Sequence, residues 1–242
     1  MYNLTNFTQE DMFRCAIALR NMNDGAKSME EVANRIIYHL YENLVDQAPD
    51  RRACALVRFF KTHSYGDLNE DLQKAASEIL GAQAAKPSTK CLTLLATAGE
   101  APEWNSRHTS IGHKAIPLID QDFIERAPMI SQLIQQFGLE AKAIIEPNPK
   151  LLLDLERKTF NVFYIDEALG SEYIPSQAHF VIPYKIKTIL GFGGMLPSGD
   201  LFAVIMFTRL LIPYQTAELF KWIAAYVRIA AAAFDQGPIF KP

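Results

Sequence analysis

The sequence predicts an α+β fold built around a largely antiparallel sheet. Three apolar runs, at residues 180–184, 189–196 and 201–207, follow one another across short turns, which is typical of a β-meander. A nearly continuous apolar helix is expected directly after them, at about residues 216–234. The earlier segments do not alternate strand with helix as a doubly wound fold requires, so the sheet is not expected to be parallel.

The first quarter of the chain is expected to form two helices followed by a strand. Residues 11–21 carry apolar side chains at helical spacing, and residues 28–44 carry a second apolar stripe. Ser28 and Glu31 have the spacing of a capping box, in which each side chain bonds to the free backbone N–H of the other residue. Residues 53–61 are rich in β-forming side chains and predict the first strand.

The middle of the chain predicts two further helices and two strands. Residues 67–80 form an amphipathic pattern that stops at Gly81, and residues 91–98 predict the second strand. A helix is expected at residues 120–137, ending at Gly138. One or two helical turns at 151–157 and a short strand at 161–165 complete this part.

The meander has the clearest local signals. Ser198 and Gly199 separate two apolar runs, and glycine adopts the positive φ that a tight turn requires. In the closing helix, Lys221 and Arg228 are the only charged residues between positions 219 and 234, and they lie seven residues apart on one face. Most of the circumference therefore needs cover, from a second copy of the chain or from its own N-terminal helices.

The composition limits the possible classes of protein. The chain has 242 residues, 49% of them apolar, which is enough for one domain with a substantial core, and its net charge of −3 is spread evenly. Because no basic stripe is present, nucleic acid is not an expected partner. Residues 219–234 are too short and too charged to span a bilayer, and the N-terminus does not resemble a secretory signal. Three unpaired cysteines predict a reducing compartment, so we expect a cytoplasmic protein.

The closing segment resembles the GAF family of sensor domains. Val181-Ile182-Pro183 matches the family's strand that ends in an apolar-Pro pair, and residues 190–196 match its glycine-rich strand. A second apolar strand and a closing helix follow; the helix positions that match are Leu219, Ala224, Val227, Ala230 and Ala231. The resemblance implies an antiparallel sheet of five or six strands, with N- and C-terminal helices packed on one face and a small-molecule pocket on the other.

The resemblance also divides the chain and implies a mode of action. Residues 1–50 would form N-terminal signalling helices, residues 51–212 the sensor core, and residues 213–242 the C-terminal helix and tail. Two departures limit what is carried over. Thr208-Arg209 stands where cyclic-nucleotide-binding members have Asn-Lys, and no cysteine is followed by the histidine that commonly accompanies covalent bilin attachment.

The candidate ligand pocket combines aromatic and imidazole side chains near predicted strand ends. These candidates are His63, Tyr65, Tyr173, His179 and Tyr184. Two long polar loops, residues 99–112 and 166–177, are expected to cover the pocket. His179 is interpreted either as a half-exposed histidine at a strand end or as an axial haem ligand. The histidines lack the spacing of a zinc site, so no metal is expected, and the sequence identifies no cofactor.

The candidate dimer interface lies on the closing helix. It comprises Leu219, Trp222, Ile223, Tyr226, Ile229 and Ala233. The expected partners are a second copy of the chain, a separate signalling protein and a small-molecule ligand. The alternative is that the N-terminal helices of the same chain cover this surface.

The sequence as a whole favours a cytoplasmic, non-catalytic sensory module that passes a signal through a helical dimer interface. One alternative is a protein-interaction module with a solid core of GAF shape; another is a sensor that uses non-covalent haem, a pigment or a redox-active thiol. The one catalytic function considered is that of a thiol-dependent reductase, because Cys54 and Cys91 lie on predicted neighbouring strands and could meet. Gly191, Gly193 and Gly194 do not have dinucleotide-loop spacing.

Overall fold

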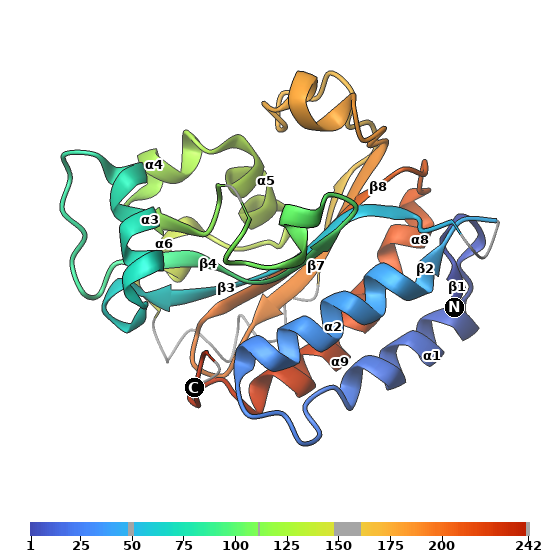
Figure 1. Cartoon of the computed structure of the whole chain (residues 1–242), viewed down its shortest axis with the longest axis horizontal. Coiled ribbons are helices and arrows are strands. Elements are labelled where there is room, and N and C mark those ends of the chain that lie inside the picture. Colours follow the sequence, from blue (N-terminus) through green and yellow to red (C-terminus); the bar gives the residue numbers. More distant parts are fainter. Residues whose placement is uncertain (48–50, 111, 148–160, 241–242) are drawn as a thin grey trace.

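The computed structural model describes residues 1–47, 51–110, 112–147 and 161–240. Its centre is a six-stranded, fully antiparallel sheet of order β5-β4-β3-β8-β7-β6, seen in Figure 1. The strands are β3 (Cys54–Ser64), β4 (Lys90–Gly99), β5 (Ala115–Leu118), β6 (Val162–Ile165), β7 (Thr188–Met195) and β8 (Leu201–Thr208). This confirms the expected fold class.

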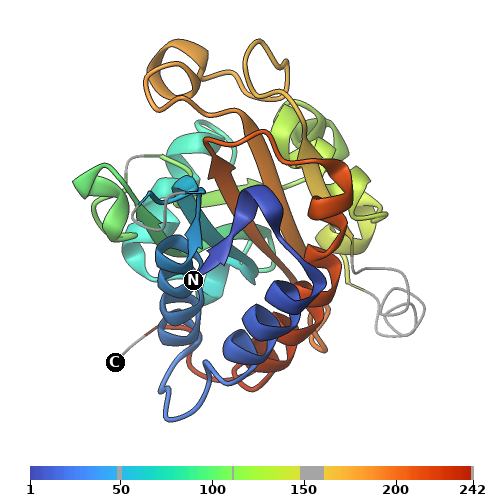
Figure 2. The ribbon, with the colours of Figure 1, turned by 90° about the vertical axis from the view of Figure 1, so that its right-hand side faces the viewer.

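Three helices cover one face of the sheet, which we call the terminal-helix face (Figures 1 and 2). They are α1 (Gln9–Arg20), α2 (Met29–Asn43) and α9 (Phe220–Ala232). Here α9 packs on β7, and α1 and α2 pack against α9. With this strand order and these terminal helices on one face, the chain has a GAF-like fold.

The opposite face of the sheet is also covered. Its core combines sheet residues with side chains from α4 (Gln121–Glu125), α5 (Pro128–Gln136), α6 (Ala141–Ile145) and the π-helix η4 (Gln177–Val181). Another helix, α3 (Glu70–Leu80), packs beside β5 in a small separate cluster. The sheet therefore separates two apolar cores, each formed from side chains that alternate along the strands.

The N-terminal caps partly follow the expected chemistry. The Ser28 hydroxyl accepts a hydrogen bond from the Glu31 N–H (3.2 Å), as a capping box requires, but the Glu31 carboxylate accepts from Lys27 instead (3.0 Å). A complete capping box forms one helix earlier, between Thr8 and Asp11. Each bond satisfies an N–H that the first helical turn leaves free.

The β7–β8 hairpin forms as predicted. Gly199 has φ 86° in the turn, a conformation that favours glycine. Gly193 lies inside β7, and a Cβ there would collide with the Phe202 carbonyl and the Phe137 ring. These glycines therefore permit close packing of a central strand and do not form a phosphate loop.

Residues 180–184 do not form the strand that the sequence predicted. The backbone N–H of Val181 donates to the Ser176 carbonyl (3.2 Å), and that of Ile182 donates to the Gln177 carbonyl (3.0 Å). These hydrogen bonds join residues five positions apart and form the π-helix η4 instead. The Gln177 amide also donates to the carbonyls of Ala168 (3.0 Å) and Ile174 (2.9 Å). These local bonds replace the sheet partner that the segment lacks.

Other boundaries differ for identifiable reasons. The helix expected at 120–137 is divided into α4 and α5 at Pro128, which cannot donate a helical hydrogen bond. β5 was not anticipated because it is four residues long and contains Pro117, which an edge strand tolerates. The closing helix begins with α8 (Tyr214–Glu218) before α9. The turns expected at 151–157 lie outside the described residues.

The two ends of the chain are tied to α2. The short strand β1 (Tyr2–Asn3) pairs in parallel with β2 (Leu44–Val45), directly after α2. At the other end of α2, the N–H groups of Met29 and Glu30 donate to the carbonyls of Pro238 (2.9 Å) and Ile239 (2.8 Å). Over the described ranges, none of the helices has the length and apolarity needed to cross a membrane.

Candidate functional site

A hollow of about 570 Å³ lies where β3 begins and β8 ends, and we call it the basic hollow. Among the described residues, its cationic lining residues are Arg51, Arg52, Lys185 and Arg209, and its one lining carboxylate is Glu100. Tyr41 and Tyr184 also line it. The volume lies within the range of small-molecule sites, and the excess of positive charge favours an anionic ligand.

Arg209 is the most constrained cation of the basic hollow. Its guanidinium donates to the carbonyls of Tyr184 (3.2 Å) and Cys54 (3.3 Å) and forms an ion pair with Glu100. Burial lowers the pKa of this group, although a guanidinium remains charged at neutral pH. Arg209 therefore joins the end of β8 to the segment after η4 and presents a fixed charge.

Aromatic rings and a strained backbone position the other groups. The Tyr184 ring lies against Trp104, with ring centroids 4.4 Å apart, and the Arg52 guanidinium lies 4.6 Å from the centroid of Tyr41. Lys185 adopts φ 55°, which is unfavourable for a residue with a side chain. Backbone strain of this kind concentrates at ligand sites.

A second hollow, of about 410 Å³, is lined by acidic side chains, and we call it the acidic hollow. Tyr173 lines it together with Asp166, Glu167 and Glu172. Its lining contains no lysine, arginine or histidine among the described residues. An anionic ligand would therefore be repelled from this hollow and attracted to the basic hollow.

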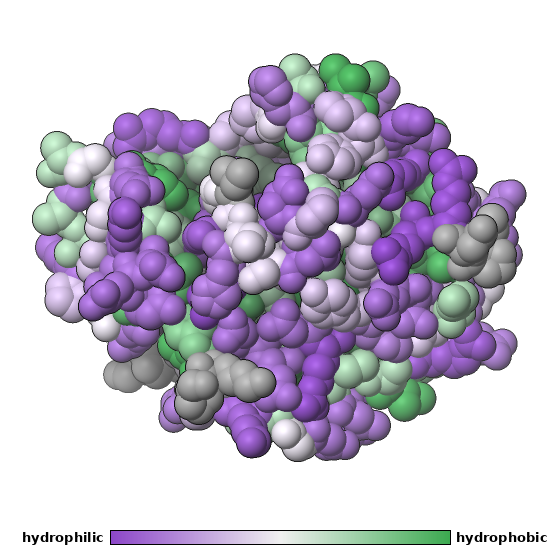
Figure 3. Space-filling view, in the orientation of Figure 1, coloured by the Kyte–Doolittle hydropathy of each residue, from purple (hydrophilic) through white to green (hydrophobic). Residues whose placement is uncertain are grey.

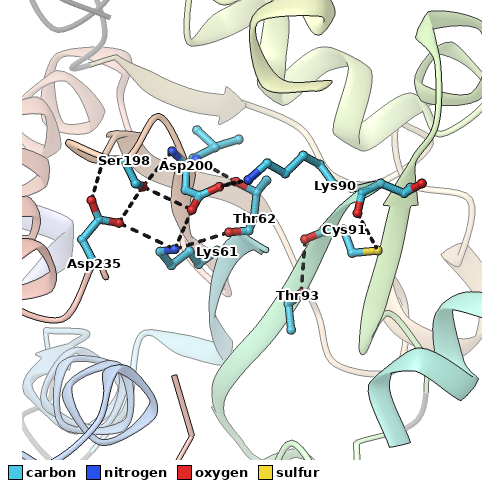
Figure 4. A network of polar contacts seen from close by, with 10 residues as sticks. Lys61, Thr62, Lys90, Cys91, Thr93, Ser198, Asp200 and Asp235 are labelled. Atoms are coloured by element: carbon cyan, nitrogen blue, oxygen red, sulfur yellow. Dashed lines mark hydrogen bonds and ion pairs between the residues drawn. The ribbon is translucent and has the colours of Figure 1, made fainter. Parts of the chain in front are cut away.

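A buried network, which we call the Asp200 cluster, links the sheet to the end of α9 (Figure 4). Asp200 accepts from Lys61 (2.9 Å) and Lys90 (2.7 Å). Asp235 lies 3.7 Å from the Lys61 ammonium and accepts from the Ser198 hydroxyl (2.7 Å). Although burial raises the pKa of Asp200, the lysine charges and bonds dominate and lower it to about 2.

His63 lies beside the Asp200 cluster, inside β3. The residue is 4% exposed, and neither ring nitrogen has a hydrogen-bond partner among the described residues. Burial, followed by the charge of Lys61, lowers its pKa to about 3. The imidazole is therefore neutral at pH 7 and is surrounded by protein.

The five predicted pocket residues do not meet in one cavity. Tyr184 lines the basic hollow, Tyr173 lines the acidic hollow, and His63 is buried beside Lys61. Tyr65 follows β3 and its hydroxyl lies 3.1 Å from that of Ser77 on α3, whereas His179 is exposed on η4. The sequence did not predict the cations of the basic hollow as a group, because Arg51 and Arg209 are 158 positions apart in the chain.

The predicted dimer surface is partly available. Trp222 and Ile229 are 61% and 51% exposed, Ala233 is exposed, and Leu219 and Tyr226 are half-buried. Ile223 is fully buried within the chain, so it is not available to a partner. The N-terminal helix α1 covers part of α9, as the alternative interpretation expected.

Two further apolar side chains, on α1, were not anticipated. Phe13 and Ile17 are 53% and 55% exposed. Figure 3 shows a hydrophobic area along α1 within a mostly hydrophilic face. Both α1 and α9 therefore carry exposed apolar side chains.

The cysteines do not form a dithiol site. Cys54 lies opposite Thr208 and Cys91 opposite His63, at the two ends of β3. At about 3.3 Å per residue, they are on the order of 30 Å apart, so the two thiols do not meet as the alternative of a thiol-dependent reductase requires. Burial raises the pKa of Cys15, Cys54 and Cys91 to about 12, which disfavours the reactive thiolate.

In the part of the chain that the structure describes, no group of three His, Cys, Asp or Glu side chains is arranged to hold a metal ion. No model of a known protein family matches the sequence, and a comparison with curated proteins gives no match. Among solved structures, the crystal structure of the phycocyanobilin-bound GAF domain from a cyanobacterial phytochrome aligns with 96% of this chain and 97% of that chain, at 10% identity and a TM-score of 0.42. The GAF-like description therefore rests on the strand order and helix placement of this chain.

Proposed function

We propose that this chain is a non-catalytic sensory module that binds a small anionic molecule in the basic hollow. The observation that carries the proposal is the convergence of four cations and two tyrosines around one hollow, in which Glu100 is the single lining carboxylate of the described residues. Such a site attracts anions and holds a planar ligand against aromatic rings.

The position of the basic hollow supports transmission to the terminal helices. Arg209 directly follows β8 and lies five residues before α8, while Tyr41 belongs to α2. A ligand that contacts both residues touches segments that hold helices on the terminal-helix face. It shifts the packing of these helices only by the difference between its affinities for the two arrangements.

The signal would leave the module through α1 and α9. Trp222, Ile229, Phe13 and Ile17 give these helices exposed apolar surface, and the proposed occupant of that surface is a second copy of the chain. A separate signalling protein would then read the arrangement of the paired helices.

Ligand binding is tested with citrate as a small anionic probe, by calorimetry at constant ionic strength. The double variant Arg52→Met/Lys185→Met is expected to bind citrate about tenfold more weakly or worse, because charged hydrogen bonds are lost. Lys27→Met/Lys74→Met removes two exposed lysines elsewhere and matches the change in net charge. Equal affinities in the two double variants would refute the site. Native mass spectrometry of freshly purified protein then identifies any retained natural ligand.

Pairing of the helices is tested by the solution mass of the chain. The native chain is expected to have the mass of a dimer, and Trp222→Glu that of a monomer, because a charge would be buried at the interface. Leu211→Glu serves as the control, since Leu211 is 66% exposed and lies outside α1 and α9. A monomeric mass for the native chain would end the dimer proposal.

The second candidate function is a protein-interaction module with a solid core. The apolar cluster on the opposite face favours it, because Phe137, Phe163, Ile189 and their neighbours fill the space above the sheet. This alternative predicts that citrate gives no binding signal and that native mass spectrometry finds no retained molecule.

A further inference from the structure

Arg58 lies in the middle of the sheet, on the face opposite the terminal helices. On β3 it stands between Thr97 of β4 and Ile205 of β8, and Ile205 belongs to the core of the opposite face. The residue is only 8% exposed. Arginine does not lose its proton in proteins, so this position places a full positive charge within an apolar core.

The charge of Arg58 is not balanced by any described carboxylate. Its Nη2 donates to the Ser110 hydroxyl (3.0 Å), while its buried Nε has no acceptor among the described residues. Burial alone lowers its pKa, to about 10, and no acidic group contributes to that shift. A buried guanidinium with one neutral partner is costly, since the desolvation of a charge normally requires an ionic partner.

Two hydroxyl groups complete a set of donors around this guanidinium. Thr97 lies directly across the strand pair from Arg58, is 1% exposed, and its Oγ1 also lacks a partner among the described residues. Ser110 accepts from Arg58 and so retains its own hydroxyl proton for donation. Nε–H and the two hydroxyls thus provide three donors for which the described residues supply neither an acceptor nor a negative charge.

The cluster lies close to the protein surface. His113 is exposed and adopts φ 55°, an unfavourable value for a residue with a side chain. Partial burial and then the charge of Arg58 lower the pKa of His113, so the two side chains interact electrostatically. An anion that reaches His113 is therefore within the field of Arg58.

We propose that Arg58, Thr97 and Ser110 form a binding site for the carboxylate or phosphate group of a small molecule. The oxyanion accepts from Arg58 Nε and from the two hydroxyls, and it supplies the negative charge that the described residues around Arg58 do not. Oxyanions are the groups that guanidinium binds most strongly, through its rigid planar donors. This site is separate from the basic hollow, with which it shares no residue, and the proposal does not depend on that hollow.

The test measures the thermal stability of the full chain in increasing phosphate or acetate, with chloride at equal ionic strength as reference. Either oxyanion is expected to raise the midpoint in proportion to its binding, and the one that does identifies the ligand class. In Arg58→Met, the fitted affinity is expected to fall about tenfold or more, because a charged hydrogen bond is lost. Arg58→Lys keeps the charge without the planar donors and should retain part of the effect.

Arg52→Met/Lys185→Met removes anion binding by the basic hollow, so the oxyanion effect that remains in this hollow variant measures the Arg58 site. Lys27→Met/Lys74→Met is the control that should keep the whole effect. If the hollow variant loses the effect and Arg58→Met keeps it, the Arg58 site is refuted while the proposed function stands. If neither phosphate nor acetate stabilises the native chain beyond chloride, the Arg58 site is also refuted. Should Arg58→Met fail to fold by circular dichroism, the Arg58 Nε–H resonance of the native chain decides: an oxyanion must shift it, and a fixed resonance overturns the proposal.

Discussion

Two buried cations of strand β3, Lys61 and Arg58, have opposite electrostatic surroundings. Lys61 stands opposite Phe202 on the terminal-helix face, with Asp200 at 2.9 Å and Asp235 at 3.7 Å. Arg58 stands on the other face, and its one hydrogen bond within the described residues is to a neutral hydroxyl. The first charge is neutralised by carboxylates of the chain, whereas no carboxylate of the described residues neutralises the second.

This difference separates a structural role from a binding role. Asp235 follows α9 and Ser198 lies in the β7–β8 turn, so the Asp200 cluster fixes the end of the closing helix to the sheet. Such a network has no unused capacity for a ligand, because its charges already bind one another. Arg58 forms no ion pair with another described residue, and the Nε–H that lacks an acceptor among these residues suits a group from outside the chain.

The largest effect is expected from breaking the Asp200 cluster. Asp200→Asn removes the negative charge next to Lys61 and Lys90, and the Lys61 side chain is only 3% exposed. Loss of one partner of a buried ion pair typically costs about 3–5 kcal/mol. Urea unfolding is expected to show a decrease of this size in the free energy of unfolding.

Asp24→Asn is the matched control for that experiment, since Asp24 is exposed and should change stability by less than about 0.5 kcal/mol. A loss below about 1 kcal/mol in Asp200→Asn would mean that the cluster contributes little to the attachment of α9.

The second effect is a dependence of stability on pH, and it tests whether His63, beside the Asp200 cluster, is shielded from protonation in the folded chain. The folded-state pKa of His63 is about 3, below its ordinary value of 6.5, so the unfolded chain binds a proton that the folded chain does not. Stability is thus fully present above pH 6.5 and is lost as the pH falls toward 3, with a slope of at most about 1.4 kcal/mol per pH unit. Asp200 adds a further loss only between about pH 4 and 2.

His63→Phe should flatten this profile between pH 7 and 4.5, measured by urea unfolding at each pH. His179→Gln, which alters an exposed imidazole, should leave the profile unchanged. If His63→Phe and the native chain had the same slope, the imidazole would be open to protons in the folded state.

The sequence predicted the elements that depend on local chemistry. Gly199 specified the β7–β8 turn, and the apolar run of 216–234 specified a covered helix, because both signals lie within a few residues. The strand predicted at 180–184 was wrong, because a strand needs a neighbouring strand and this segment instead forms local hydrogen bonds to Ser176 and Gln177. β5 depended on pairing with β4, which no local pattern specified.

The candidate sites were harder to predict because they depend on contacts between distant residues. Arg58 lies between apolar residues of β3, and a charge within this apolar run was the signal available in the sequence. Whether it is paired depends on Thr97 and Ser110, which come from the next strand and from the loop after it. In the same way, the basic hollow combines Arg52 with Arg209, which only the pairing of β3 and β8 brings together.

The smallest expected change in stability is that of Arg58→Met. It distinguishes the two buried cations most directly, because its sign is opposite to that of the loss expected in Asp200→Asn. Arg58→Met keeps the unbranched stem of the side chain and removes a buried charge that no described carboxylate balances, so in oxyanion-free buffer it should leave stability unchanged or raise it by about 1 kcal/mol. Urea unfolding of Arg58→Met beside Lys61→Met provides the contrast, since Lys61→Met leaves Asp200 with one cation fewer and is expected to destabilise. A loss of about 3 kcal/mol or more in Arg58→Met would mean that its charge is balanced within the chain after all, and the distinction between the two cations of β3 would then disappear.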